Sequence, residues 1–191
     1  MRFNIFTQID SMRLLIICIL MISFVNCKSK SNTIPTLKTH QKQAFELEKC
    51  AIDSECSIEI IPNSSLLIKQ DELQNTYIKL EHGNNTIVKY EFKRKEIPDI
   101  ADGNYSELIY FEIDENNKQL FLTNGALQNV KMIYGRFCYC KDGTSGYFKV
   151  TEGRLKLIKN DKELSIDLNF KVGKIPQLLT EIKETITLKE I

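Results

Sequence analysis

The sequence lacks the residues and motifs on which many enzymes depend. It contains only two histidines, His40 in a polar segment and His82 in a predicted turn. It has no Gly-x-Ser-x-Gly elbow, phosphate-binding loop, glycine-rich dinucleotide loop or His-Glu-x-x-His pair. Because histidine is the usual base near neutral pH, these absences argue against nucleophilic hydrolysis. We therefore predict that the protein is not an enzyme and has no catalytic residue and no cofactor.

The chain also lacks an excess of charge of either sign. Lysine and arginine number 26, aspartate and glutamate number 25, and the sequence has no block of like charges. A nucleic-acid-binding domain would show a basic excess. The charge balance therefore excludes nucleic acid from the predicted partners.

The apolar run near the start is too short to span a membrane. Residues 14–25 carry no charge, but these twelve residues fall short of the roughly 20 that a membrane-spanning helix needs. The run follows Arg13 and stops abruptly at Asn26, as the apolar region of a signal peptide does. We predict a signal peptide over residues 1–26, with Met12 as an alternative start of translation.

Residues 24–27 read Phe-Val-Asn-Cys, and the cysteine stands where the apolar run ends. Within residues 12–28 this segment resembles the lipobox of bacterial lipoproteins. The resemblance implies that Cys27 is acylated, that residues 1–26 are removed, and that the lipid on Cys27 holds the protein to a membrane. Because Lys28 and not Asp follows, the sorting rule of many Gram-negative lipoproteins implies the outer membrane, on either its periplasmic or its surface face.

A polar segment follows the cysteine. Residues 28–43 contain four lysines, one proline and no acidic residue, a composition typical of a flexible linker. We predict a lipidated tether over residues 27–44, a short helical turn at 44–49, and a globular domain over residues 45–191.

The globular part is dominated by alternation of apolar and polar residues. Leu164, Ile166, Leu168, Phe170 and Val172 alternate with polar residues, which predicts a strand with one face in water. Further strands fit residues 57–61, 66–70, 77–81, 88–92, 105–113, 118–123, 127–140, 146–151, 154–159 and 185–189, separated by turns rich in Asn, Asp and Gly. We predict an all-β antiparallel sandwich or small barrel of roughly 9–11 strands.

Two segments depart from this alternation. Residues 105–113 are apolar at both parities, which predicts a central strand or a strand whose second face meets a ligand. Residues 176–183 follow the i, i+3, i+4, i+7 pattern after Pro176, which predicts a short helix. The domain should contain at most one or two such helices.

Four cysteines remain in the globular part: Cys50, Cys56, Cys138 and Cys140. An even number in an exported chain predicts two disulfides. In an extended strand, the Cα atoms of residues 138 and 140 would lie about 6.5 Å apart, at the edge of disulfide geometry. We therefore predict that both join the 50–56 segment. A zinc site or a redox thiol pair is the alternative, but neither has its usual cysteine spacing here, so we predict no metal.

The remaining chemical candidates are aromatic residues and carboxylates. Tyr139 and Tyr147 flank a glycine-rich hairpin, and exposed aromatic rings there would form a binding surface for protein or glycan. Carboxylates occur in local pairs: Asp53 with Glu55, Asp71 with Glu72, Asp99 with Asp102, and Asp114 with Glu115. Residues 99–104 could offer oxygen ligands to calcium, but they lack the regular spacing of a calcium loop.

Three classes of function are compatible with these observations. We favour a lipid-anchored, non-catalytic binding or structural module of the cell envelope, such as an inhibitor or immunity protein, with a protein or glycan partner. A lipocalin-like carrier would instead enclose an apolar cavity. A carboxylate-based glycan-processing enzyme would place two acids about 5–9 Å apart in a cleft.

Overall fold

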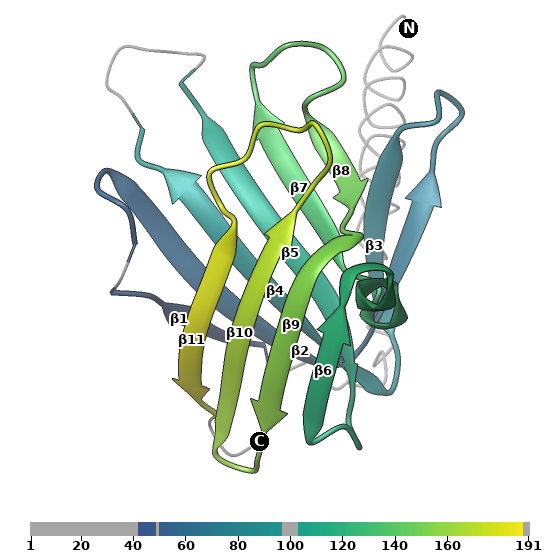
Figure 1. The fold of residues 1–191 in the computed structure, drawn as a ribbon, viewed down its shortest axis with the longest axis vertical. Coiled ribbons are helices and arrows are strands. Elements are labelled where there is room, and N and C mark those ends of the chain that lie inside the picture. Colours follow the sequence, from purple (N-terminus) through teal and green to yellow (C-terminus); the bar gives the residue numbers. More distant parts are fainter. Residues whose placement is uncertain (1–41, 49, 97–102, 189–191) are drawn as a thin grey trace, which may run out of the picture. The chain divides into compact units, whose positions relative to one another are not determined.

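The computed structural model describes residues 42–48, 50–96 and 103–188, which belong to one compact unit (Figure 1). These residues form two antiparallel sheets and one short 3-10 helix, which confirms the predicted all-β sandwich class. The predicted signal peptide, Cys27 and nearly all of the tether lie outside the described residues, as do Asp99 and Asp102. Within the described ranges, no helix has the length and apolarity needed to cross a bilayer.

Seven strands form the larger sheet, in the order β1-β2-β4-β5-β7-β8, with β3 paired to β2. Their bounds are β1 Gln43–Glu46, β2 Ser54–Gln70, β3 Thr76–His82, β4 Asn85–Arg94, β5 Tyr105–Asp114, β7 Ile133–Cys138 and β8 Gly146–Lys149. The smaller sheet has the order β11-β10-β9-β6. Its strands are β6 Gln119–Thr123, β9 Glu152–Lys159, β10 Glu163–Lys171 and β11 Glu181–Thr187.

The core lies between the two sheets. On β10, the apolar side chains Leu164, Ile166, Leu168 and Phe170 are buried, and the polar residues between them are exposed or half-buried. They join one apolar cluster with inward-facing residues of the larger sheet, such as Ile109. The alternation read from the sequence therefore marks the faces of the sandwich correctly.

A second apolar cluster lies on the other face of the larger sheet. β2 pairs with β3 and β4 in turn, so that residues 54–94 form one long hairpin with a register break between Ile61 and Ser64. Beyond this break, Leu66 joins Leu108, Tyr110 and Ile133 in one buried cluster, so the hairpin tip contributes to the cover of the outer face. The segment 82–85, predicted as a hairpin turn, is instead the place where the hairpin bends.

β5 is the central strand that its composition predicts, because residues 107–113 are buried on both faces. Glu107 points into the sandwich among the core residues, whereas Glu112 points to the opposite face. Glu112 accepts hydrogen bonds from the Leu66 amide (2.7 Å), the Asn85 side chain and the Lys131 ammonium (2.9 Å). Burial by itself raises the pKa of Glu112, but these donors outweigh it and hold the pKa below its usual value. Glu112 thus fastens the bent hairpin to the sheet as an anion.

The helix predicted over residues 176–183 is wrong. The Gln177 side chain accepts a hydrogen bond from the Val172 amide (2.7 Å) and donates one to the Leu179 carbonyl (2.8 Å). The Leu178 and Leu179 amides donate to the Glu107 carboxylate. Because side chains hold these backbone groups, the segment forms a loop that leads into β11.

Two further sequence predictions are wrong in type. The helical turn at 44–49 is wrong, since Gln43–Glu46 pairs with β2 as an edge strand. The strand predicted over 127–140 begins instead with the 3-10 helix η1, Asn124–Val130. Asn124 (φ 50°), the first residue of η1, and Lys131 (φ 51°), which follows it, adopt left-handed backbone, a conformation that does not continue a strand.

Candidate binding site at one end of the sandwich

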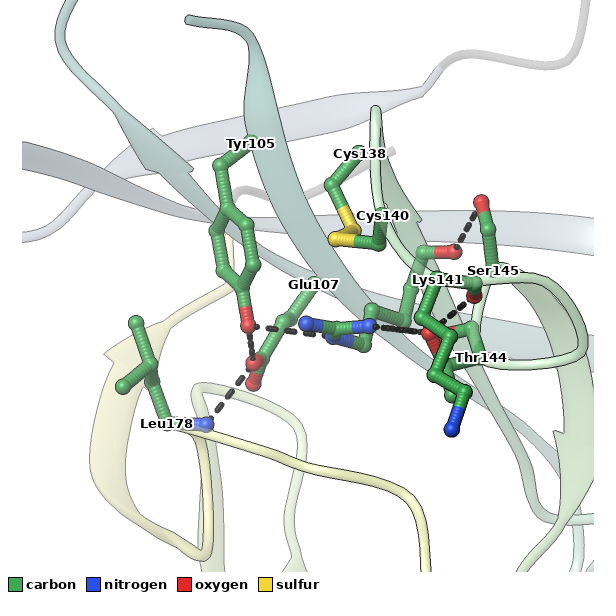
Figure 2. Close-up of a disulfide and its surroundings, with 9 residues drawn as sticks. Tyr105, Glu107, Cys138, Cys140, Lys141, Thr144, Ser145 and Leu178 are labelled. Atoms are coloured by element: carbon green, nitrogen blue, oxygen red, sulfur yellow. Dashed lines mark hydrogen bonds between the residues drawn. A yellow bond between two sulfur atoms is a disulfide. The ribbon is translucent and has the colours of Figure 1, made fainter.

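Several chain segments meet at one end of the larger sheet. Cross-strand pairing joins Ser54 of β2 to Arg94 of β4, and Tyr105 of β5 to Cys138 of β7. The start of β2, the end of β4, the start of β5 and the end of β7 therefore lie at the same end. The loop between β10 and β11 reaches this end as well, because Leu178 contacts Glu107 (Figures 1 and 2). We call this the loop end.

The loop end carries both disulfides, and their predicted pairing is wrong. Cys50 bonds to Cys56. Cys138 bonds to Cys140 (Figure 2). β7 ends at Cys138, so the chain turns before Cys140 and the two Cα atoms come to 5.2 Å, closer than in an extended strand. β4 and β5 separate the two pairs in the sheet. Each bond closes a short loop, which stabilises the fold less than a cross-link between distant segments would.

The loop after Cys138 is held by hydrogen bonds as well as by its disulfide. Arg136 donates to the carbonyl (2.8 Å) and hydroxyl (3.0 Å) of Thr144, and the Ser145 hydroxyl donates to the Arg136 carbonyl (3.1 Å). The Thr144 hydroxyl donates in turn to the Lys141 carbonyl at 2.6 Å (Figure 2). Because its two ends and its turn are fixed, this loop presents Tyr139 in a defined place.

The two tyrosines predicted to form a binding surface lie in different environments. Tyr139 sits between the bonded cysteines and is 87% exposed. Tyr147 is half-buried in the second apolar cluster, where its ring packs edge-on against Phe137 with centroids 5.1 Å apart. Burial raises the pKa of Tyr147. Tyr139 is therefore the accessible member of the pair.

A buried polar cluster, formed by Tyr105, Glu107 and Arg136, lies beneath this loop. Glu107 is fully buried and accepts hydrogen bonds from the amides of Leu178 (2.7 Å) and Leu179 (2.6 Å), and from the Tyr105 hydroxyl. Arg136 of β7 lies opposite Glu107 of β5 in the strand register, and its Nε donates a hydrogen bond to the Tyr105 hydroxyl at 3.4 Å. The cluster thus links the loop between β10 and β11 to the loop that carries Tyr139.

Two buried or half-buried tyrosines of this region, Tyr105 and Tyr134, have raised pKa values. Burial first, and then the hydrogen bond to Glu107, raise the pKa of Tyr105. Burial and the negative charge of Glu107 raise the pKa of the neighbouring Tyr134. Since both hydroxyls stay protonated at neutral pH, the Tyr105 hydroxyl remains a donor to the Glu107 carboxylate.

This polar cluster was not predicted from the sequence. A signal was present, because Glu107 is a carboxylate within a strand that is apolar at both parities. A buried carboxylate requires several donors. Two of the donors to Glu107 are backbone amides 71 and 72 positions away along the chain, which sequence spacing does not reveal.

A groove of about 500 Å³ opens beside Tyr139. Its aromatic lining consists of Tyr105, Phe137 and Tyr139, next to Cys138. Its polar lining consists of Lys93, Glu96, Asn104 and Ser106. We call it the Tyr139 groove. It is open to solvent.

A second open groove, of about 770 Å³, lies beside the other disulfide and shares Lys93 with the first. Ile52, 93% exposed, lies on its rim. Its ionisable lining is mainly acidic: Glu46, Glu48, Asp53, Glu55 and Glu91, with Lys93 and Lys95. Such a surface repels polyanions.

Of the five aspartates considered from sequence, the structure describes Asp53, Asp71 and Asp114, which come from three separate segments of the chain. Asp71 and Asp114 accept hydrogen bonds from residues of their own turns. Asp53 is the one of the five that lines either groove of the loop end, as far as the described residues show. Residues 42–48, 50–96 and 103–188 hold no group of three or more His, Cys, Asp or Glu able to bind a metal ion.

Comparison with known proteins gives little. No protein-family model matches the chain, and no solved structure matches it. A protein of Rickettsia bellii (strain RML369-C), named as an ankyrin repeat protein, is 30% identical over 92 residues. The match covers 47% of this chain but only 13% of that protein. Ankyrin repeats contain two helices each, whereas the described residues here are mainly strands, so the name carries no argument about this fold.

Proposed function

We propose that this protein is an exported, lipid-anchored binding module of the cell envelope, held by lipid on Cys27 in the outer membrane. It binds a protein or glycan partner at the loop end and performs no catalysis. The observation that carries the proposal is Tyr139, an almost fully exposed aromatic residue fixed beside a groove by a disulfide and by Arg136.

Exposed tyrosines on rigid loops are well suited to binding. An aromatic side chain offers a large contact area with only two rotatable bonds, so that little conformational entropy is lost in a complex. A loop already held in its bound shape lowers the cost of association further. Ile52 and Leu178 (55% exposed) add apolar surface on two other loops of the same end.

The carrier alternative receives less support from the arrangement of the side chains. Buried apolar side chains from both sheets form one cluster, which includes Ile58, Phe111, Tyr134, Leu157 and Phe170. The two hollows of the loop end are open grooves with polar walls. A lipocalin-like carrier would instead enclose its ligand.

The anchor is tested by Cys27→Ser. Without the thiol no lipid can be attached, so we expect loss of fatty-acid labelling and release of the protein from the membrane fraction. Cys18→Ser, within the predicted signal peptide, is the matched control and should leave both unchanged. A Cys27→Ser protein that is still labelled and membrane-bound would disprove the lipid anchor.

The binding surface is tested by placing a photoreactive amino acid at residue 139 in cells. We expect irradiation to give an adduct of higher mass, because Tyr139 is the aromatic residue presented at the groove. The same amino acid at Tyr77, an exposed tyrosine of β3, should give none. Adducts at neither position, or equally at both, would contradict a binding site at the loop end.

A further inference from the structure

We infer that the Tyr139 groove binds an uncharged oligosaccharide, with a sugar ring stacked on Tyr139. This inference rests on the proposed binding function and names the class of its ligand. It follows from the kinds of side chain that line the groove and from the ring faces that they leave free.

Tyr139 supplies an open ring face, whereas Tyr105 does not. The guanidinium groups of Arg94 and Arg136 lie 5.1 and 5.4 Å from the centroid of the Tyr105 ring, so that cations occupy this ring. Tyr105 is therefore a wall of the groove. The face of an aromatic ring carries negative charge density, which attracts the polarised C–H groups on the apolar face of a sugar.

The polar lining matches hydroxyl groups, each of which donates and accepts a hydrogen bond. Lys93 donates, Glu96 accepts, and Asn104 and Ser106 do both. Among the described residues that line the groove, Lys93 is the one cation, and it pairs with Glu96 at 3.7 Å, so this lining offers no uncompensated cation to a phosphate, sulfate or carboxylate. The acidic second groove beside it further disfavours anionic polymers. A neutral ligand rich in hydroxyl groups fits this lining.

The lining of the groove, as far as the described residues form it, favours a sugar over a peptide. Among the described residues that line the Tyr139 groove there is no Leu, Ile, Val or Met. Sites for apolar ligand groups are lined mainly by hydrophobic side chains with few polar ones, whereas half of this lining is polar. The volume of about 500 Å³ is within the range of small-molecule sites, which accommodates a short oligosaccharide.

The test uses the lipidated full-length protein in detergent and a panel of fluorescently labelled neutral oligosaccharides: chitotriose, cellotetraose and maltotetraose. We expect at least one to bind. Tyr139→Ala should weaken that binding about tenfold or more, as expected for loss of a central aromatic contact. Tyr139→Phe should bind as well as the wild type, because stacking does not need the hydroxyl. Tyr77→Ala, on β3, is the control and should have no effect.

Tyr139→Leu separates stacking from general apolar contact. If this variant binds as tightly as wild type, or if Tyr139→Ala does, the ring does not stack on a sugar and the inference is wrong. If no oligosaccharide binds but residue 139 still gives a protein adduct in cells, the inference fails while the binding module stands. If neither experiment gives a ligand, both proposals fail.

Discussion

Replacing Glu107 by alanine is expected to lower the free energy of unfolding by about 3–5 kcal/mol, measured by urea denaturation. The carboxylate is fully buried and accepts hydrogen bonds from two backbone amides and from Tyr105. Alanine would leave these donors without an acceptor and would also open a cavity. Tryptic cleavage after Lys174, in the loop between β10 and β11, should become faster because the loop is no longer fastened.

Two variants make this measurement specific. Glu107→Gln preserves the shape but turns an amide toward backbone donors, so its loss should be smaller, about 1–3 kcal/mol. Glu115→Ala removes an exposed carboxylate from the turn after β5 and should change stability by less than about 0.5 kcal/mol. Equal stabilities for Glu107→Ala and the wild type would show that Glu107 does not hold the loop.

Gly153→Ala is expected to destabilise the protein by about 2–5 kcal/mol, from backbone strain together with overpacking. Gly153 has φ of 139°, a conformation that residues with a side chain rarely adopt. A Cβ atom at this position would lie 2.2 Å from the carbonyl oxygen of Asn169 and 2.7 Å from the Cα of Phe170. These are backbone atoms of the paired strand, so β9 and β10 would have to separate.

The matched control is Gly125→Ala. A Cβ atom at Gly125 would meet nothing within 4 Å, and this glycine has no positive φ. We expect its melting temperature to stay close to that of the wild type, while that of Gly153→Ala falls by many degrees. Similar melting temperatures for the two variants would mean that β9 and β10 do not approach closely at Gly153.

The strands that were predicted well are those in which apolar and polar residues alternate. In β10 every second side chain is apolar, and the buried face follows directly. β5 was recognised as central because both of its parities are apolar. These properties are local, since they depend only on neighbours along the chain.

Predictions failed where a distant residue decides the local structure. The segment after Pro176 has helical periodicity, yet Glu107 and Gln177 take the backbone groups that a helix would use. The predicted disulfide pairing is wrong because Cys140 does not lie on an extended strand: β7 ends at Cys138. In each case the residues involved can be read from the sequence, but the contact or turn that determines the local structure cannot.

The candidate site was predictable only in part. The position of Tyr139 beside a glycine-rich hairpin was visible, and its exposure agrees with a binding role. The different environment of Tyr147 was not visible in the sequence. Tyr147 is half-buried in a cluster to which the bent hairpin of β2 and β3 contributes. The groove was not visible in the sequence either, because its lining residues come from β4, β5 and β7 and from the residues next to these strands.

The two carboxylates of β5 also determine how this strand can be placed in the sheet. A strand that is apolar on both faces has little preference between its two possible orientations, because a slip of one residue exchanges one apolar face for the other. Here such a slip would move Glu112 into the sandwich core and Glu107 under the hairpin tip, each away from its donors. Both errors would bury an unsatisfied charge at once. Glu107 and Glu112 therefore together make a one-residue slip of the central strand energetically unfavourable.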